Sequence, residues 1–326
     1  MNTARTQIPM MRSVVQSRFG DASVLEIASL PIPSPLPTEI RVRVLAAGIN
    51  PVDWKTREGH GMAGVLGDPP FTLGWDVAGV VDAVGFGVTT VAVGDRVYGM
   101  PWFPRAANGY SEYVTAPARQ FARTPASISD AAAAAVPLAG LTAWQILVDT
   151  ANIQAGQRIL ITAGAGGVGH FAVQLARHFG AYVVTTAGPA NHEWLRELGA
   201  DEVLDYHDPD YAAQINDIDL VVDLVGHRDQ RALLKAVRPG GLFVSVPGGV
   251  SDDLAAASAE RGVAATGFLV EPDGAALARI GALIESGAVT VEVAAAFPLD
   301  EVAIAHKLAE ANHTRGKIVL LLERVA

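Results

Sequence analysis

The sequence predicts an α/β protein in which a β-rich N-terminal part is followed by a doubly wound parallel sheet. In the first third of the chain, short runs rich in Val and Tyr are separated by Gly and Pro, which is typical of strands joined by tight turns. From Arg158 onward, strand patterns alternate with helix patterns, as in βαβ units. The length of 326 residues is sufficient for two domains.

The N-terminal strands are expected to be short. Residues 40–48 alternate apolar and polar side chains, and residues 76–85, 95–99 and 110–115 are further strand candidates. A closed or partly closed barrel is the natural way for so many short strands to avoid exposed edges. An Ala-rich stretch after residue 130 predicts helices.

The second part of the chain predicts alternating elements. Strands are expected at 158–163, 182–187, 201–206, 219–226 and 241–248, and helices at 168–180, 191–199 and 228–237. After Pro272 the pattern predicts a helix at 274–286, a strand at 289–293, a helix at 300–311 and a last strand at 317–322.

Composition and charge exclude several classes of protein. Lys and Arg number 24 against 34 Asp and Glu, a net charge of −10 without a basic stretch, which argues against a nucleic-acid partner. The absence of Cys excludes disulfides and thiolate metal sites. The apolar stretches are too short for a membrane span, and residues 1–12 contain no apolar run of signal-peptide length. We therefore expect a cytoplasmic protein that acts on a small molecule.

A glycine-rich motif points to a dinucleotide. It has the pattern G-x-G-x-x-G, follows a predicted strand and begins a predicted helix, and it consists of Gly164, Ala165, Gly166, Gly167, Val168 and Gly169. Such glycines let the backbone approach a pyrophosphate at the N-terminus of the helix. The alternative is a glycine-rich turn that binds no ligand.

The residues after this motif favour NADP(H) over NAD(H). An NAD site usually has Asp or Glu at the end of the second strand, where it binds the ribose 2′-hydroxyl. Here that strand ends in Thr186, Ala187 and Gly188, and residues 150–192 contain no Asp or Glu. A carboxylate would repel a 2′-phosphate, whereas hydroxyls and backbone N–H groups would not. No clear Arg or Lys clamp is present, and the nearest basic candidate is Arg196.

Taken in order, several motifs resemble the zinc-independent quinone oxidoreductases of the medium-chain dehydrogenase/reductase superfamily. The resemblance runs over nearly the whole chain, from Val24 to the segment at Arg315. Its motifs occupy residues 46–59, 70–85, 93–100, 109–117, 137–145, 164–169 and 198–206.

The resemblance implies a particular domain plan. A catalytic domain with a GroES-like β-barrel fold would comprise residues 1–135 and 272–326, and a Rossmann domain would be inserted at 136–271. NADPH would lie in the cleft between them, and family members commonly form homodimers.

The resemblance also shows that metal ligands are missing. Zinc enzymes of the superfamily take ligands from a Cys and from a Gly-His-Glu motif, and the matching places in this chain read Ile49-Asn50 and Gly74-Trp75-Asp76. We therefore expect no metal site. Hydride transfer to a quinone or to an α,β-unsaturated carbonyl remains feasible without a Lewis acid.

The cofactor residues are carried over from the family motifs. Thr142 would contact the phosphate or ribose on the nicotinamide side, and Thr186, Gly188, Asn191 and Tyr206 would surround the 2′-phosphate. Plain strand and turn packing is the alternative for Thr186 and Tyr206. The residues bordering the nicotinamide ring would be Val225, Pro247, Phe268, Leu269 and Val270. Lys317 belongs to a family-typical Gly-Lys pair, or is a solvated charge on the last strand.

Asn50 is the main catalytic candidate, because its amide would donate to the substrate carbonyl and stabilise an enolate. The alternative is an Asn that caps a turn before Pro51. Lys55 stands where many quinone oxidoreductases have Tyr, and it is a candidate proton donor. Two other functions stay open: a pathway-specific enoyl reductase, and a non-catalytic protein that senses NADPH.

Overall fold

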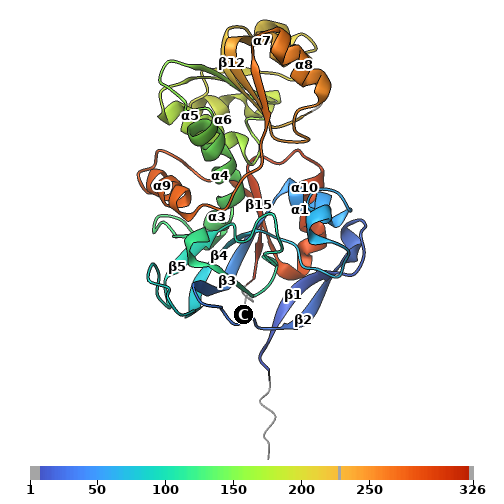
Figure 1. The fold of residues 1–326 in the computed structure, drawn as a ribbon, viewed down its shortest axis with the longest axis vertical. Coiled ribbons are helices and arrows are strands. Elements are labelled where there is room, and N and C mark those ends of the chain that lie inside the picture. Colours follow the sequence, from blue (N-terminus) through green and yellow to red (C-terminus); the bar gives the residue numbers. More distant parts are fainter. Residues whose placement is uncertain (1–7, 227–228, 323–326) are drawn as a thin grey trace, which may run out of the picture. The chain divides into compact units, whose positions relative to one another are not determined.

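The computed structural model describes residues 8–226 and 229–322, which form two compact units (Figure 1). The first unit contains the chain up to Leu138 together with Glu271–Glu285 and the chain from Val293 onward. The second unit contains Ala139–Val270 and Ser286–Glu292. The sequence placed the domain boundaries at 135 and 271 and did not anticipate that the short segment Ser286–Glu292 groups with the second unit.

The first unit is built on a seven-stranded sheet and a separate hairpin. The sheet has the order β14-β15-β3-β4-β5-β7, with β6 also paired to β3. The hairpin consists of β1 (Met10–Gln16) and β2 (Leu25–Pro31). The sheet strands are β3 (Glu39–Ile49), β4 (Asp76–Val84), β5 (Arg96–Gly99), β6 (Tyr113–Pro117), β7 (Phe121–Arg123), β14 (Val293–Pro298) and β15 (Lys317–Leu321).

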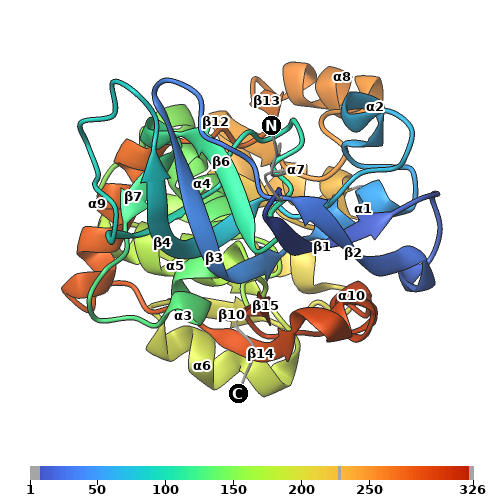
Figure 2. The same ribbon diagram turned by 90° about the horizontal axis from the view of Figure 1, so that it is seen from below.

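Strand β3 organises this unit because it has three partners. It pairs antiparallel with β4 along most of its length, with β6 through its first half and with β15 through its last residues (Figure 2). The β15 pairing joins the C-terminal strand to the strand that ends at Ile49. Residues 49 and 317, far apart in the sequence, therefore lie together at one end of β3.

Helices flank the strands of the first unit. Burial follows the helical period in the longer ones, since Leu277, Ile280 and Ile284 of one helix are buried. The helices are α1 (Pro51–Arg57), α2 (Ala63–Leu66), α3 (Asp130–Ala134), α9 (Gly274–Glu285) and α10 (Val302–Glu310).

The second unit confirms the predicted parallel sheet. Its six strands have the order β10-β9-β8-β11-β12-β13, the doubly wound arrangement in which the strand order reverses beside the first strand. The strands are β8 (Arg158–Ile161), β9 (Tyr182–Thr186), β10 (Glu202–Leu204), β11 (Ile218–Asp223), β12 (Val237–Ser245) and β13 (Ala264–Gly267).

The helices of the second unit lie on both faces of this sheet, as right-handed crossovers in two directions require. Figure 1 shows α5 and α6 together on one side of the sheet and α7 and α8 on the other. Helix α4 (Pro137–Trp144) enters the unit and continues as a π-helical segment, Gln145–Thr150. The others are α5 (Gly169–His178), α6 (His192–Glu197), α7 (Gln230–Ala236) and α8 (Asp252–Glu260). Residue 228, where the sequence placed the start of a helix, lies outside the described residues.

The strand expected at 289–293 is wrong in position, because β14 begins only at Val293. The reason is a side-chain contact that replaces strand pairing. Gln174 of α5 accepts hydrogen bonds from the backbone N (2.8 Å) and the hydroxyl (3.0 Å) of Thr290, and it donates to the Thr290 carbonyl (3.1 Å). This part of the chain is therefore fixed to α5 of the second unit.

Among the described residues, no helix combines the length and apolarity that a transmembrane segment needs.

Candidate functional site

The glycine-rich loop follows β8 and leads into α5, as the sequence predicts. Two hydrogen bonds hold the loop against the end of β9. Gly164 N donates to the Thr186 carbonyl (2.9 Å), and Ala163 N donates to Thr186 Oγ1 (3.1 Å). Ala163 has a φ of 51°, which turns the chain sharply out of the strand. Thr186 therefore shapes the loop with both its backbone and its side chain.

The glycines of this loop lack a side chain for two different structural reasons. A Cβ on Gly164 would lie 2.1 Å from Thr185 Oγ1, and a Cβ on Gly169 would lie 2.2 Å from the Ala163 carbonyl oxygen. These two residues allow close packing of the loop against β9 and of α5 against the loop. Gly166 has only the Ala163 oxygen nearby, at 3.2 Å, so its glycine leaves open space above the backbone. That space and the uncapped start of α5 fit a pyrophosphate.

A second group of predicted residues gathers at the carboxyl ends of β9 and β10. The strands are parallel, and Ala187 N donates to the Leu204 carbonyl (3.0 Å) where they end. Beyond this bond, Gly188 faces the Tyr206 hydroxyl and the His207 ring, which lie 3.9 and 3.5 Å from where a Cβ on Gly188 would be. We call Gly188, Asp205, Tyr206 and His207 the adenosine corner. Asn191 ends the short 3₁₀ turn that follows Gly188.

A buried carboxylate that the sequence analysis missed, Asp223, organises the ends of β8, β11 and β12. Its Oδ1 accepts hydrogen bonds from the backbone N of Val225 and Gly226 and from the Thr162 hydroxyl, each at 3.1 Å. Its Oδ2 accepts one from Gln230 Nε2 at 2.8 Å, and the same Nε2 donates to Ser245 Oγ at 3.0 Å. Asp223 therefore fixes the loop that contains Val225.

The remaining residues predicted to border the nicotinamide differ in exposure. Val225 and Leu269 are exposed, whereas Val270 and Thr142 are buried. Pro247 packs beside Gly226, and Phe268 N donates to the Ser245 carbonyl (3.1 Å). A ring-facing role for the backbone suits Val225, Pro247, Phe268 and Leu269 at this edge of the sheet, and it stays a prediction.

In the first unit, Asn50 is the centre of a buried cluster. Asn50 directly follows β3 and is the N-cap residue of α1, and Asp53 Oδ2 accepts a hydrogen bond from Asn50 N (2.7 Å). Asn50 Nδ2 donates to Asp76 Oδ2 (2.8 Å), and Lys317 Nζ donates to Asn50 Oδ1 and to the Ile49 carbonyl (2.9 Å). Lys317 Nζ also lies 3.6 Å from Asp76 Oδ2.

The alternative that Lys317 is a solvated charge on the last strand is wrong, because the residue is only 4 % exposed. The pairing of β15 with β3 places it inside the unit, where Asp76 compensates its charge. Burial lowers the pKa of Lys317 and raises the pKa of Asp76, and the attraction between the two charges opposes both shifts. The ion pair keeps two charged groups in the interior.

A chain of buried polar groups leads away from Asn50. Burial raises the pKa of Asp53 to about 7 and raises the pKa of Tyr110, and the neighbouring charge of Asp53 adds to the shift of Tyr110. The Tyr110 hydroxyl is 3.4 Å from His306 Nε2, and Arg57 Nη1 is 3.2 Å from His306 Nδ1. Arg57 also donates to Glu310 Oε1 (2.5 Å). Burial and the neighbouring Arg57 lower the pKa of His306 to about 3.

Lys55, the predicted proton donor, lies in α1 with an exposed side chain, apart from this buried cluster. The structure thus brings together Asn50 and Lys317 in the first unit, and the glycine-rich loop with the residues of the adenosine corner in the second.

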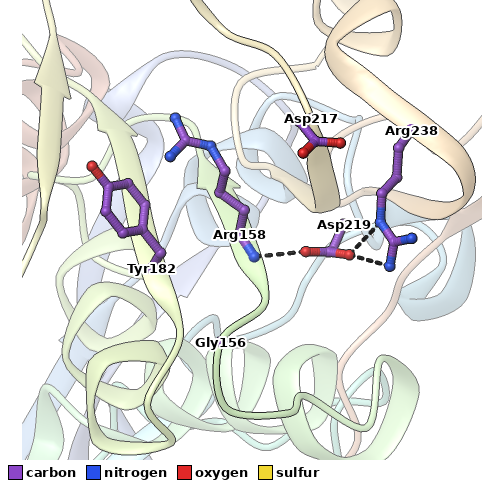
Figure 3. Close-up of a pocket in the computed structure, with 6 residues that line it drawn as sticks. All are labelled: Gly156, Arg158, Tyr182, Asp217, Asp219 and Arg238. Atoms are coloured by element: carbon purple, nitrogen blue, oxygen red, sulfur yellow. Dashed lines mark hydrogen bonds and ion pairs between the residues drawn. The ribbon is translucent and has the colours of Figure 1, made fainter.

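A polar hollow of about 440 Å³ opens at the amino ends of the parallel strands. Figure 3 shows Arg158, Asp219 and Arg238 around it, and their charges are already paired. Arg158 N donates to Asp219 Oδ2 (2.7 Å), and its guanidinium binds Glu202 (2.8 Å) and stacks on Tyr182. Because ligands of such sheets bind at the carboxyl ends of the strands, this hollow is not a cofactor site.

Sequence reasoning missed Asp76 because its partners Asn50 and Lys317 are distant in the chain, and Asp223 because its partner Thr162 is 61 residues away. It missed His207, whose partner Asp205 is only two residues away, because the pairing of β9 with β10 brings its ring to Gly188. Asp76 matches the last residue of the Gly-His-Glu motif and was considered only as a missing zinc position. For Asp223, the signal available was a carboxylate at the end of an otherwise apolar strand.

Comparison with known proteins agrees with this geometry. Residues 36–126 match the alcohol dehydrogenase GroES-like domain, and residues 198–320 match the zinc-binding dehydrogenase family. The NADPH-dependent alkenal/one oxidoreductase of Arabidopsis thaliana chloroplasts is 35 % identical over 98 % of this chain and 81 % of its own length. The 2-haloacrylate reductase of a Burkholderia species is 32 % identical over 96 % of this chain and 99 % of its own length.

A solved structure gives the same result at the level of the fold. The quinone oxidoreductase of Coxiella burnetii superimposes with a TM-score of 0.90 and 34 % identity over 97 % of this chain and 100 % of that one. The predicted combination of a GroES-like domain and a Rossmann-type sheet is thereby confirmed. The protein is an oxidoreductase, and it belongs to the medium-chain dehydrogenase/reductase superfamily, together with quinone oxidoreductases and alkenal reductases.

Proposed function

We propose that the protein uses NADPH to transfer hydride to quinones or to the β-carbon of α,β-unsaturated carbonyl compounds. The observation that carries this proposal is the packing of the glycine-rich loop against β9. This strand ends at Thr186 and is followed by Ala187 and Gly188, so no carboxylate stands at its end. The alkenal, haloacrylate and quinone substrates in the names of the relatives support the acceptor class.

The residues present fit this cofactor. The space above Gly166 and the start of α5 would receive the pyrophosphate, with Gly167 and Val168 contributing backbone. The ends of β9 and β10 would receive the adenosine ribose, and the loop fixed by Asp223 would border the nicotinamide. When bound, NADPH supplies the hydride from C4 of its nicotinamide.

Asn50 is proposed to hold the substrate oxygen. Lys317 Nζ can only donate and the Asp76 carboxylate can only accept, so these two partners fix which end of the amide carries the N–H groups. Asp76 takes one of the two N–H groups, which leaves the second to donate to an oxyanion that develops as hydride arrives. Lys317 and Asp76 are thus positioning residues for Asn50, and solvent or the exposed Lys55 delivers the proton.

The proposed reaction does not use zinc. The described residues contain no group of three or more His, Asp or Glu arranged to hold a metal ion. An ammonium lies beside the residues that stand at the places of the zinc ligands, since Lys317 Nζ binds Asn50 Oδ1 and lies 3.6 Å from Asp76 Oδ2. A divalent cation would face that positive charge.

We also propose a homodimer in the cytoplasm, with the domain plan implied by the family.

Two variants test this proposal when NADPH oxidation is followed with a panel of quinones and enones. Asn50→Ala is expected to lower kcat/KM by about 10²-fold or more, the usual cost of losing an oxyanion donor. Asn216→Ala serves as the control, because Asn216 is exposed and precedes β11, at the amino ends of the parallel strands and not at their carboxyl ends. Lys55→Met is expected to slow enones more than quinones, since a quinone needs less help with protonation.

The panel also separates the other functions. If the protein binds NADPH but does not oxidise it with any acceptor of the panel, it is a sensor. This result would contradict the proposal. High activity with one enoyl substrate and none with quinones would favour a pathway-specific enoyl reductase.

A further inference from the structure

The adenosine corner contains a histidine whose second nitrogen has no partner. His207 Nδ1 is 2.6 Å from Asp205 Oδ1, and the same oxygen accepts a hydrogen bond from His207 N (3.0 Å). The carboxylate can only accept, so Nδ1 carries a proton. His207 Nε2 makes no hydrogen bond within the described part of the chain. Asp205 therefore fixes the ring orientation and leaves Nε2 available.

The ring edge next to Nε2 faces the place where the ribose is expected. His207 Cε1 is 3.5 Å from the position of a Cβ on Gly188, and this carbon lies between Nδ1, which binds Asp205, and Nε2. The His207 ring packs against Tyr206, with ring centroids 4.2 Å apart, so both rings stand beside Gly188. A group bound over Gly188 would contact the Cε1 edge of this ring, beside Nε2.

From this geometry we propose that His207, held by Asp205, recognises the 2′-phosphate of NADPH. The inference rests on the proposed use of NADPH and identifies the residue that reads its extra phosphate. It also supplies the clamp that the sequence lacks, since no Arg or Lys precedes Arg196 after β9 and that side chain is exposed on α6.

The charged groups around His207 determine what it offers to a phosphate. Asp205 is the nearest carboxylate, and Asp208 follows it in the same turn, where Asp208 N donates to the Asp205 carbonyl. His192, at the start of α6, also lies near Asp205 and contacts the Ala187 carbonyl through Nε2 (3.0 Å). To bind a phosphate, the ring carries a proton on both nitrogens, so that Nδ1–H binds Asp205 while Nε2–H donates to a phosphate oxygen. The Asp205–His207 pair is then neutral overall and does not repel the ligand.

The experiment compares two small ligands that differ only in the 2′-phosphate. Binding of 2′,5′-ADP and 5′-AMP to the full-length wild-type protein and to the His207→Gln variant is measured by calorimetry in the same buffer. The wild type is expected to prefer 2′,5′-ADP, and His207→Gln is expected to lose about tenfold of that preference.

A second variant has the opposite expected sign. Asp205→Asn removes the carboxylate beside the phosphate and keeps an oxygen that accepts from Nδ1–H, so the preference for 2′,5′-ADP is expected to increase several-fold. His178→Gln is the matched control, because His178 is exposed at the far end of α5. An unchanged preference in His207→Gln, or an equal loss for both ligands, would overturn the inference. Binding without turnover would instead contradict the proposed function, so the two failures are distinguishable.

Discussion

Asp53 and His306, both buried in the first unit, are expected to act on stability with opposite dependence on pH. Burial raises the pKa of Asp53 from 3.8 to about 7 and lowers the pKa of His306 from 6.5 to about 3. Between about pH 4 and pH 6.5, folded Asp53 keeps a proton that the unfolded chain releases, so its contribution to stability falls as pH rises. Folded His306 lacks a proton that the unfolded chain binds, so its contribution rises with pH. The two contributions largely cancel in the wild type.

Replacing one of these two residues should reveal the pH dependence of stability that the other contributes. In Asp53→Asn, the slope of unfolding free energy against pH should become more positive than in the wild type, by up to about 1.4 kcal/mol per pH unit. In His306→Gln the slope should become more negative by a similar amount. Urea unfolding at several pH values in this range measures both slopes. His313→Gln, on an exposed residue, is the control and should keep the wild-type slope. Slope changes of the same sign in the two variants would refute the cancellation.

At the same residue scale, Asn50 shows what the sequence can and cannot predict. Its segment and its position before Pro51 were sufficient to select it, and its place as the N-cap of α1 agrees with the alternative that it caps a turn. Its partners Asp76 and Lys317 are 26 and 267 residues away in the chain. Only the pairing of β3 with β4 and β15 brings them to Asn50, and no local pattern encodes that pairing.

At the scale of elements, prediction worked where a local pattern and a backbone requirement coincide. The loop between β8 and α5 is the best example, because close packing at Gly164 and Gly169 permits no larger residue. It failed at 289–293, where Val residues alternate as in a strand but Gln174 of a distant helix takes the backbone groups of Thr290. A side chain that replaces a strand partner leaves no periodic signal.

Substitutions at two glycines of the loop should distinguish an effect on stability from an effect on NADPH binding. Gly164→Ala should destabilise the protein by about 1–3 kcal/mol, because the new Cβ would overlap Thr185 Oγ1 inside the sheet. Gly166→Ala should change stability by only about 0.5 kcal/mol but weaken NADPH binding tenfold or more, since its Cβ would enter the space expected for the pyrophosphate. Urea unfolding and NADPH fluorescence titration measure the two effects. Gly64→Ala, whose Cβ would meet nothing within 4 Å, is the control. Normal NADPH affinity in Gly166→Ala would contradict this assignment.

On the scale of the whole molecule, the distribution of charge matters more than the net charge of −10. The chain lacks acidic residues from 150 to 192, which suggested a site for a phosphorylated ribose. The fold brings Asp205 and His207, which follow the neighbouring strand β10, to that site. A count along the sequence could not include either residue, because the parallel pairing of β9 and β10 alone places them beside Gly188.

The cofactor should therefore stabilise the whole protein according to its 2′-phosphate. A ligand that binds only the folded state adds about 2.7 kcal/mol of stability at 100 times its Kd, which corresponds to several degrees in Tm for a chain of this size. NADPH should reach this shift at a lower concentration than NADH, because NADH lacks the group that His207 is proposed to bind. Thermal unfolding across a concentration series of each nucleotide measures the difference, and the His207→Gln variant should bring the two curves together. Equal shifts with NADH and NADPH in the wild type would mean that the acid-free stretch does not select the phosphate.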